Sequence, residues 1–164
     1  AVRLAYLTVT LGAYVASLTV NAAAALGEEI GWRGYLYRQL GFAPSLRNTV
    51  AVGALWGLWH APAILLLGRG YRVGGALGVP LFTALCVALS HPLLLLTAEA
   101  GSVLPAASMH GAVNALWGLT LASPDQPQGA GEALPGLLGA ASWAIVGLSL
   151  QLMLKAWRRL RGTR

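Results

Sequence analysis

Two adjacent carboxylates, Glu28 and Glu29, are the first candidates for chemistry in this sequence. They lie in the segment GEEIGWRG at residues 27–34, directly after an apolar run at residues 4–26 that is long enough to cross a lipid bilayer. An ionisable side chain at membrane depth costs about 2.5–3.5 kcal/mol on insertion scales, so such a side chain is a candidate for a functional site by default. The segment therefore predicts a polar site within or beside a membrane.

Helical geometry gives the two carboxylates different roles. Neighbouring residues on an α-helix point about 100° apart, so Glu28 and Glu29 cannot face the same target. Glu29 and Arg33 are spaced i, i+4 with the acid first, which is the favourable order for an ion pair within a helix. We therefore expect Glu29 and Arg33 to support the structure, and Glu28 to be the carboxylate that is available for chemistry.

A histidine, His60, lies in the middle of a second apolar segment. Gly53 and Gly57 precede it with the small-xxx-small spacing that lets another helix approach closely. Pro62 follows it, and proline removes a backbone donor, so the carbonyl of Leu58 should be freed beside the imidazole. We expect a kinked helix that turns His60 toward the interior.

A later apolar segment carries His110 and Asn114, which are four residues apart and therefore share one face of a helix. Gly111 and its small neighbours form a second seam for close packing. Three close-packed helices would thus turn four side chains toward one polar cavity: Glu28, His60, His110 and Asn114.

Composition indicates what surrounds this cavity, because 57% of the residues are hydrophobic and only 10% are charged. Such a chain is an integral membrane protein. We expect a single all-α domain over residues 1–164, a polytopic transmembrane helical bundle with an amphipathic interfacial helix at residues 28–40. About five spans are predicted, at residues 4–26, 49–67, 76–98, 102–122 and 134–157. Pro92 should kink the third of them.

The formal net charge of +6 comes largely from the C-terminus, where five of the eleven basic residues lie in the last ten positions. Basic residues directly after an apolar run indicate a cytoplasmic anchor at the lipid surface rather than a nucleic-acid site. The predicted location is the cell's inner or plasma membrane, with lipid as a partner and no nucleic acid. The single cysteine, Cys86, excludes an internal disulfide framework and a cysteine metal site.

Three motifs occur in order along the chain: EEIGWRG from Glu28, LWGLWH ending at His60, and HGAVN ending at Asn114. They resemble the EExxxR, FxxxH and HxxxN motifs of the CPBP family of intramembrane proteases, which includes the type II CAAX prenyl endopeptidases and the Abi proteins. The resemblance covers residues 28–114, and Trp56 stands where the family pattern has phenylalanine. Each motif alone is weak, but three in this order are specific. Because the family usually has more than five spans, the resemblance also implies further helices before Ala1.

The resemblance implies hydrolysis of a peptide bond in a membrane-associated peptide or protein, prenylated or not. Carried over residue by residue, Glu28 would be the general base for a water molecule with help from His60, and His110 and Asn114 would stabilise the oxyanion. A catalytic zinc ion held by Glu28, His60 and His110 is the alternative, although the HExxH signature is absent. The cofactor is thus either none or zinc, and we favour hydrolysis by metal-free water.

Other interpretations account for the same residues without catalysis. The carboxylates could be a solvated helix end, His60 a packing residue, and the tryptophans Trp32, Trp56 and Trp117 packing or interface anchors. His91, which belongs to no motif, is interpreted as structural. At the level of function, the alternatives are a non-enzymatic bacteriocin-immunity or scaffold protein, and a small transporter. A transporter needs a polar path through the membrane, and the third and fifth predicted spans offer no second polar cluster to extend one.

Overall fold

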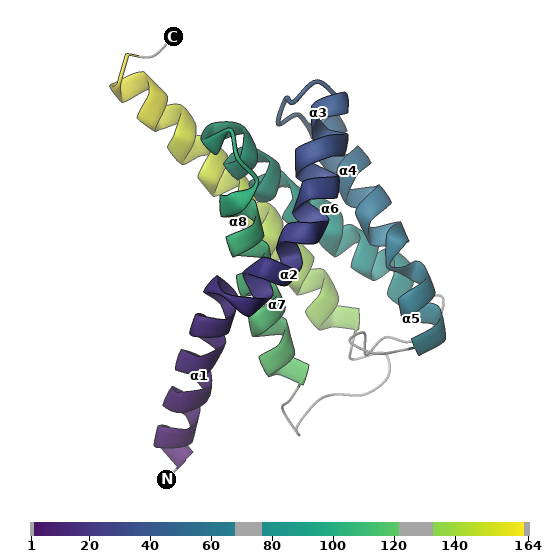
Figure 1. The fold of residues 1–164 in the computed structure, drawn as a ribbon. Helices are drawn as coiled ribbons and strands as arrows, with labels where there is room; N and C mark the ends of the chain where they lie inside the picture. The colour runs from purple at the N-terminus through teal and green to yellow at the C-terminus, as the bar shows by residue number, and fades with distance from the viewer. Residues whose placement is uncertain (1, 68–76, 122–132, 163–164) are drawn as a thin grey trace.

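The computed structural model describes residues 2–67, 77–121 and 133–162, which are helical almost throughout and contain no strand (Figure 1). The elements are α1 (Val2–Leu18), α2 (Val20–Glu29), the π-helical η1 (Ile30–Leu36), α3 (Tyr37–Gln39), α4 (Leu46–Trp59), α5 (Ala61–Leu67), α6 (Gly78–Ala100), α7 (Leu104–Leu121) and α8 (Ala133–Leu160). The predicted all-α class is confirmed.

Four helical segments in the described residues are long and apolar enough to cross a membrane: Leu7–Gln39, Leu46–Leu66, Gly78–Ala100 and Leu138–Leu160. They correspond to four of the five predicted spans. Helix α7 covers the remaining one, but its apolar run is interrupted by His110 and Asn114, and it is not among the four. The polar connections predicted after residue 68 and after residue 122 lie largely outside the described residues.

The first span differs from the prediction in two places, at an internal bend and at its C-terminal end. Thr19 separates α1 from α2, and Figure 1 shows the change of direction there. The hydroxyls of Ser17 and Thr19 donate to the carbonyls of Tyr14 (2.6 Å) and Val15 (2.7 Å), and hydroxyl bonds to the preceding turn bend helices. At the other end the helix continues through the carboxylates to Gln39 instead of ending there.

The segment predicted to be an amphipathic interfacial helix, residues 28–40, continues the first span and buries one of its faces. A π-helix occupies Ile30–Leu36, and the N–H of Tyr37 donates to the carbonyl of Trp32, five residues earlier. Arg33 and Tyr37 are fully buried. Ile30, Tyr35 and Arg38 are exposed, so the segment is amphipathic as predicted.

Helix α6 is the centre of the bundle, and α4, α7 and α8 all pack on it. A Cβ atom on Gly53 or Gly57 would collide with the α6 backbone at Val87 and Thr83, so glycine is required for the close approach of α4. Gly111 likewise lets α7 approach the backbone of α2. The predicted small-residue seams are thus present, and they bring the helices that carry the motifs together.

Helix α4 ends at Trp59 and α5 begins at Ala61, so the helix breaks at His60 as Pro62 predicts. Helix α6, in contrast, is continuous through Pro92. The break places the imidazole at a bend where backbone carbonyl groups are free to accept side-chain donors.

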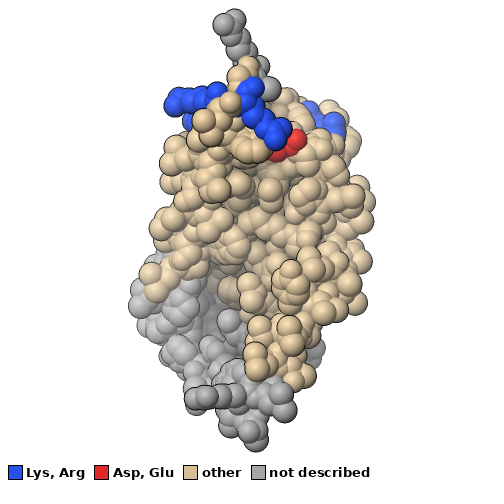
Figure 2. All heavy atoms as spheres, turned by 90° about the vertical axis from the view of Figure 1, so that its left-hand side faces the viewer, with Lys and Arg blue, Asp and Glu red and all other residues tan. Residues whose placement is uncertain are grey.

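Lys and Arg side chains gather at one end of the molecule (Figure 2), where α8 terminates and α3 connects to α4 (Figure 1). An ion pair between Arg158 and Glu99 joins the end of α8 to the end of α6 there. A basic end opposite a long apolar body is the arrangement of a membrane-spanning bundle. The assignment of this end to the cytoplasm stays a prediction.

Candidate active site

All four side chains that the sequence predicts to face one another line a single cavity of about 120 Å³. Glu28 reaches it from α2, His60 from the break between α4 and α5, and His110 and Asn114 from α7. Helix α6 closes the cavity with apolar side chains, among them Phe82, Leu85, Cys86 and Leu89. The cavity therefore combines four polar groups with an otherwise apolar wall.

Glu28 is held in place by an indole. Trp56 Nε1 donates to Glu28 Oε2 at 2.7 Å, and Trp56 itself is almost fully buried. This bond was not predicted: the sequence suggested only altered packing where the family pattern has phenylalanine. A phenyl ring could not donate it, whereas a buried indole N–H usually finds a partner. With Oε2 bonded to Trp56, Oε1 is the oxygen of Glu28 that remains for a water molecule.

His60 is oriented by the break in its own helix. The backbone N–H of His60 donates to Gly57 O at 3.1 Å instead of to Trp56 O, one residue further back. The freed Trp56 carbonyl lies 2.9 Å from His60 Nδ1, and a carbonyl only accepts, so Nδ1 carries the proton. Nε2 is then the acceptor nitrogen. The sequence predicted a free carbonyl beside the imidazole but assigned it to Leu58. The carbonyl that contacts the ring is that of Trp56.

The predicted ion pair of Glu29 and Arg33 forms at 2.9 Å, with both side chains fully buried. Arg33 also donates to Ser90 Oγ of α6 at 2.9 Å and lies over the ring of Trp56, 4.4 Å from its centroid. An isolated charge would be very costly at this depth, and these contacts compensate both charges. Through its bond to Ser90, Arg33 connects η1 to the central helix α6.

Glu29 has a second partner that the sequence did not indicate. Its Oε1 atom lies 2.9 Å from His110 Nδ1, on α7. A carboxylate accepts, so Nδ1 is protonated and the ring is fixed with Nε2 on the other side. Glu29 therefore positions one of the cavity residues in addition to pairing with Arg33. No spacing rule relates residues 81 positions apart, so only the folded chain could supply this contact.

Asn114 lies one helical turn beyond His110 and is exposed, although it lines the cavity. It therefore marks the open edge of the cavity. Trp117 lines the cavity as well, while Trp32 packs edge-to-face on Trp59 at 6.2 Å between ring centroids. Two of the three tryptophans expected as packing residues thus also form walls of the site.

A second concavity meets the site at Glu28. It is an outer groove of about 730 Å³ between α4 and the end of the first span, α2 with η1. Its walls include Trp32, Tyr35, Leu55 and Trp59. Glu28 lines both the inner cavity and this outer groove. A molecule lying in the groove would therefore contact the carboxylate directly.

The alternative zinc set is not assembled. In the described part of the chain, no three His, Cys, Asp or Glu side chains lie close enough to bind one metal ion. The spacing of the side chains accounts for this, and not their hydrogen bonds, because a histidine bonded through Nδ1 could still bind a metal through Nε2. The residues do not fit the metal site proposed for Glu28, His60 and His110, and no step below involves a metal.

His91 lies outside the cavity, as its interpretation as a structural residue requires. Its Nδ1 atom lies 3.2 Å from Thr49 Oγ1, and its Nε2 atom lies 3.3 Å from Gln151 Oε1. These contacts join α4, α6 and α8, so the expectation that the third and fifth spans offer no second polar cluster was wrong.

Comparison with known proteins identifies the class. Helices that can span a membrane enclose a cavity lined by a carboxylate, two imidazoles and an amide, which defines a membrane-embedded protein with a hydrolase-like site. A family model described as type II CAAX prenyl endopeptidase Rce1-like matches residues 10–116. No curated protein and no solved structure matches the chain. The chain belongs to the Rce1-like family of type II CAAX prenyl endopeptidases.

Family membership confirms the resemblance that the three motifs carry, and all four cavity residues fall inside the matched region. It implies an integral membrane protease that acts on a membrane-associated protein substrate.

Proposed function

We propose that this protein is an intramembrane endopeptidase that hydrolyses a peptide bond with a water molecule activated by Glu28. The observation that carries the proposal is the convergence of Glu28, His60, His110 and Asn114 on one small cavity from three separate helical segments. Each of these side chains alone would be explained by packing. Together they offer a base, a water-orienting acceptor and donors for an oxyanion, which is the set that amide hydrolysis requires.

In the first step Glu28 accepts a proton from the attacking water through Oε1, because Oε2 is bonded to Trp56. His60 Nε2 accepts the second hydrogen of the same water and directs its oxygen toward the scissile carbonyl. The indole and the imidazole thus fix the base and the nucleophile before the substrate reacts, which lowers the entropic cost of reaching the transition state.

In the second step the carbonyl oxygen becomes an oxyanion, and His110 and Asn114 donate to it. Donation from His110 Nε2 requires protons on both ring nitrogens, and the Nδ1 proton then stays with Glu29 Oε1, 2.9 Å away. The side-chain amide of Asn114 supplies a second donor at the cavity edge. Glu28, now protonated, returns its proton to the leaving amine, so protons balance over the cycle.

The outer groove suggests how a membrane-associated substrate reaches Glu28. Its walls are mainly aromatic and apolar, and an apolar or lipid-modified segment could lie against Trp32 and Trp59 while its peptide bond enters the cavity. Both prenylated and unmodified membrane-anchored proteins meet this description. The substrate class is therefore a protein whose cleavage site lies at membrane depth.

The test compares cells that make the wild-type protein with cells that make Glu28→Gln at the same level. Mass spectrometry of protein termini in isolated membranes should reveal new termini that depend on the wild-type protein and disappear with Glu28→Gln. The control is Glu99→Gln, which removes a carboxylate outside the cavity and should leave these termini unchanged. Identical termini in wild-type and Glu28→Gln membranes would contradict the proposal and favour a non-enzymatic immunity or scaffold role.

A further inference from the structure

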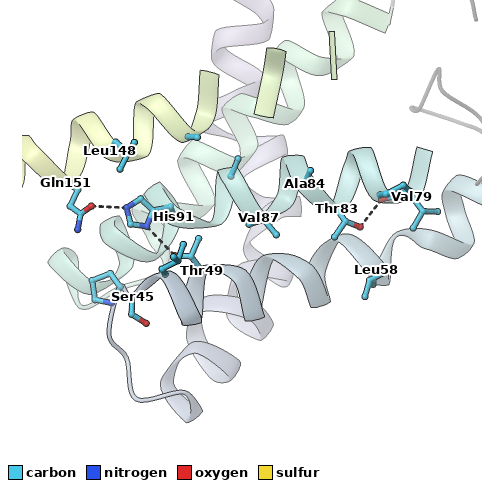
Figure 3. A pocket seen from close by; sticks show the side chains of 15 residues that line it. Ser45, Thr49, Leu58, Val79, Thr83, Ala84, Val87, His91, Leu148 and Gln151 are labelled. Carbon is cyan, nitrogen blue, oxygen red and sulfur yellow. Dashed lines mark hydrogen bonds between the residues drawn. The ribbon is translucent and has the colours of Figure 1, made fainter. Parts of the chain in front are cut away.

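A second concave site lies on the face of α6 that points away from the cavity. It is a groove of about 1010 Å³, and its walls are α4 and α8 with α6 as its floor (Figure 3). In the described residues α4 and α8 each pack along α6 but make no extensive contact with each other, which leaves this face of α6 uncovered. We call this concavity the α4–α8 groove. None of the cavity residues lines it.

The α4–α8 groove is polar at one end and apolar along the rest. Figure 3 shows Ser45, Thr49, His91 and Gln151 together at one end. Toward the other end the walls are aliphatic, and the hydroxyl of Thr83 is already bonded to a backbone carbonyl at 2.8 Å. The groove is therefore amphipathic along its length, which matches a molecule with one polar end and a long apolar tail.

Its polar end retains unused donors. The contacts of His91 with Thr49 Oγ1 (3.2 Å) and Gln151 Oε1 (3.3 Å) fix the ring and the amide oxygen. The amide N–H groups of Gln151 then remain for an ester or phosphate oxygen. A cluster of polar side chains inside a membrane span is itself a candidate for a functional site.

Positive charge borders the same end. Ala144, Leu148 and Gln151 line the groove and follow one stripe of α8, and Lys155 continues that stripe one turn further. Arg47, in the first turn of α4, lies at the same end of the bundle but does not line the groove. The groove lining contains no acidic residue. A negatively charged head group at this end would meet Lys155 beyond the α8 wall, with Arg47 next to the lining residue Leu46 of α4.

We propose that the α4–α8 groove binds one anionic glycerophospholipid from the surrounding membrane. The phosphate lies between Lys155 and Arg47, the ester region contacts Gln151, and one acyl chain runs along the α6 floor. Along α4 the lining extends from Ser45 to Leu58, which is about 20 Å at 1.5 Å per residue. The hydrocarbon core of a bilayer is about 30 Å thick, so the groove is longer than one leaflet of about 15 Å and can hold an acyl chain. The lipid joins α4 to α8, which the chain itself leaves apart.

The steric test uses two substitutions on α8 at exposed alanines three residues apart. Ala144 lines the groove and Ala141 does not. Native mass spectrometry of the detergent-purified protein with equal amounts of dioleoyl phosphatidylglycerol and phosphatidylcholine should show one retained phosphatidylglycerol per chain. Ala144→Trp should lower its retention at least about fivefold, and Ala141→Trp should not. Retention by Ala144→Trp equal to that of wild type overturns the proposal.

The charge test needs no change of shape, so it remains informative if Ala144→Trp fails to fold. Lys155→Gln should reduce the preference for phosphatidylglycerol over phosphatidylcholine about fivefold, the effect of one basic residue near an anionic lipid surface. Arg161→Gln removes an equal charge from the same end, in the turn directly after α8, and should have little effect. Equal retention of both lipids by the wild-type protein overturns the proposal, as does a lipid-free dimer that fills the groove with a second copy.

Discussion

Helix α6 separates two sites that both contain histidine, and the histidines differ in how many ring nitrogens are committed. On one side, His60 and His110 each use Nδ1 for a bond that fixes the ring, and Nε2 makes no hydrogen bond to any residue that the structure describes. On the other side, both ring nitrogens of His91 are bonded. A histidine with one bonded and one available ring nitrogen can interact with another molecule. A histidine whose two ring nitrogens are both bonded joins helices.

Replacing the histidines tests this difference most strongly. His110→Ala should lower the cleavage rate per folded molecule by about 10²–10³-fold, because it removes an oxyanion donor. His60→Ala should cost about 10²–10⁴-fold through loss of water orientation. His91→Ala should leave the rate within about threefold of wild type. Rates are measured by cleavage of an identified substrate in detergent, with the folded fraction measured separately; equal losses for all three variants would remove the distinction between the sites.

Breaking the buried ion pair should have the next largest effect, and this effect is on stability. Arg33→Met leaves the buried carboxylate of Glu29 with His110 as its remaining partner and without its arginine, so the free energy of unfolding should fall by about 3–5 kcal/mol. Arg38→Met, an exposed arginine five residues later, is the matched control and should change it by less than about 0.5 kcal/mol. Titration with denaturing detergent in mixed micelles measures both. A stable Arg33→Met variant would mean that the pair does not hold the bundle together.

Trp56→Phe tests whether the indole N–H of Trp56 positions the carboxylate of Glu28. It keeps an aromatic ring beneath Arg33, although a smaller one, and removes the bond of 2.7 Å to the carboxylate, restoring the residue of the family pattern. Loss of one hydrogen bond to a charged group is worth about 1.5–3 kcal/mol, so we expect a rate reduction of about tenfold or more with retained folding. Trp157→Phe, an exposed ring on α8 that lines neither the cavity nor the outer groove, is the control. A Trp56→Phe enzyme as fast as wild type would show that the indole N–H does not position the base.

The smallest effect is expected at the polar end of the α4–α8 groove. Gln151→Leu removes the contact with His91 but keeps the side-chain size, and interhelical hydrogen bonds in membranes contribute about 0.6 kcal/mol on average. The unfolding free energy should fall by about that amount and the cleavage rate should not change. A loss of activity as large as that of His60→Ala would mean that the groove and the cavity are coupled.

Local spacing rules predicted what lies within one helix. The i, i+4 pair of Glu29 and Arg33, the break near Pro62 and the close approach at Gly53 all follow from residue types at short range, and the structure contains each of them. The convergence on one cavity was also predicted, but the family motifs rather than spacing made it specific.

Contacts between distant segments were the part that spacing could not supply. The bond of Glu29 to His110 and the bond of Trp56 to Glu28 depend on how three helices pack, and no pattern in the sequence encodes that geometry. The bend at Thr19 and the π-helix after Glu29 were missed because serine, threonine and glycine within an apolar run are compatible with a straight helix.

The central claim is that two adjacent carboxylates have separate tasks, with Glu28 performing chemistry and Glu29 holding the structure. Glu28→Gln and Glu29→Gln, compared in one experiment, test it most directly by measuring the unfolding midpoint and the cleavage rate of each purified variant. Glu28→Gln should keep the unfolding midpoint of wild type and no longer cleave. Glu29→Gln should have a strongly lowered unfolding midpoint. A Glu28→Gln protein that still cleaves at the wild-type rate would contradict it.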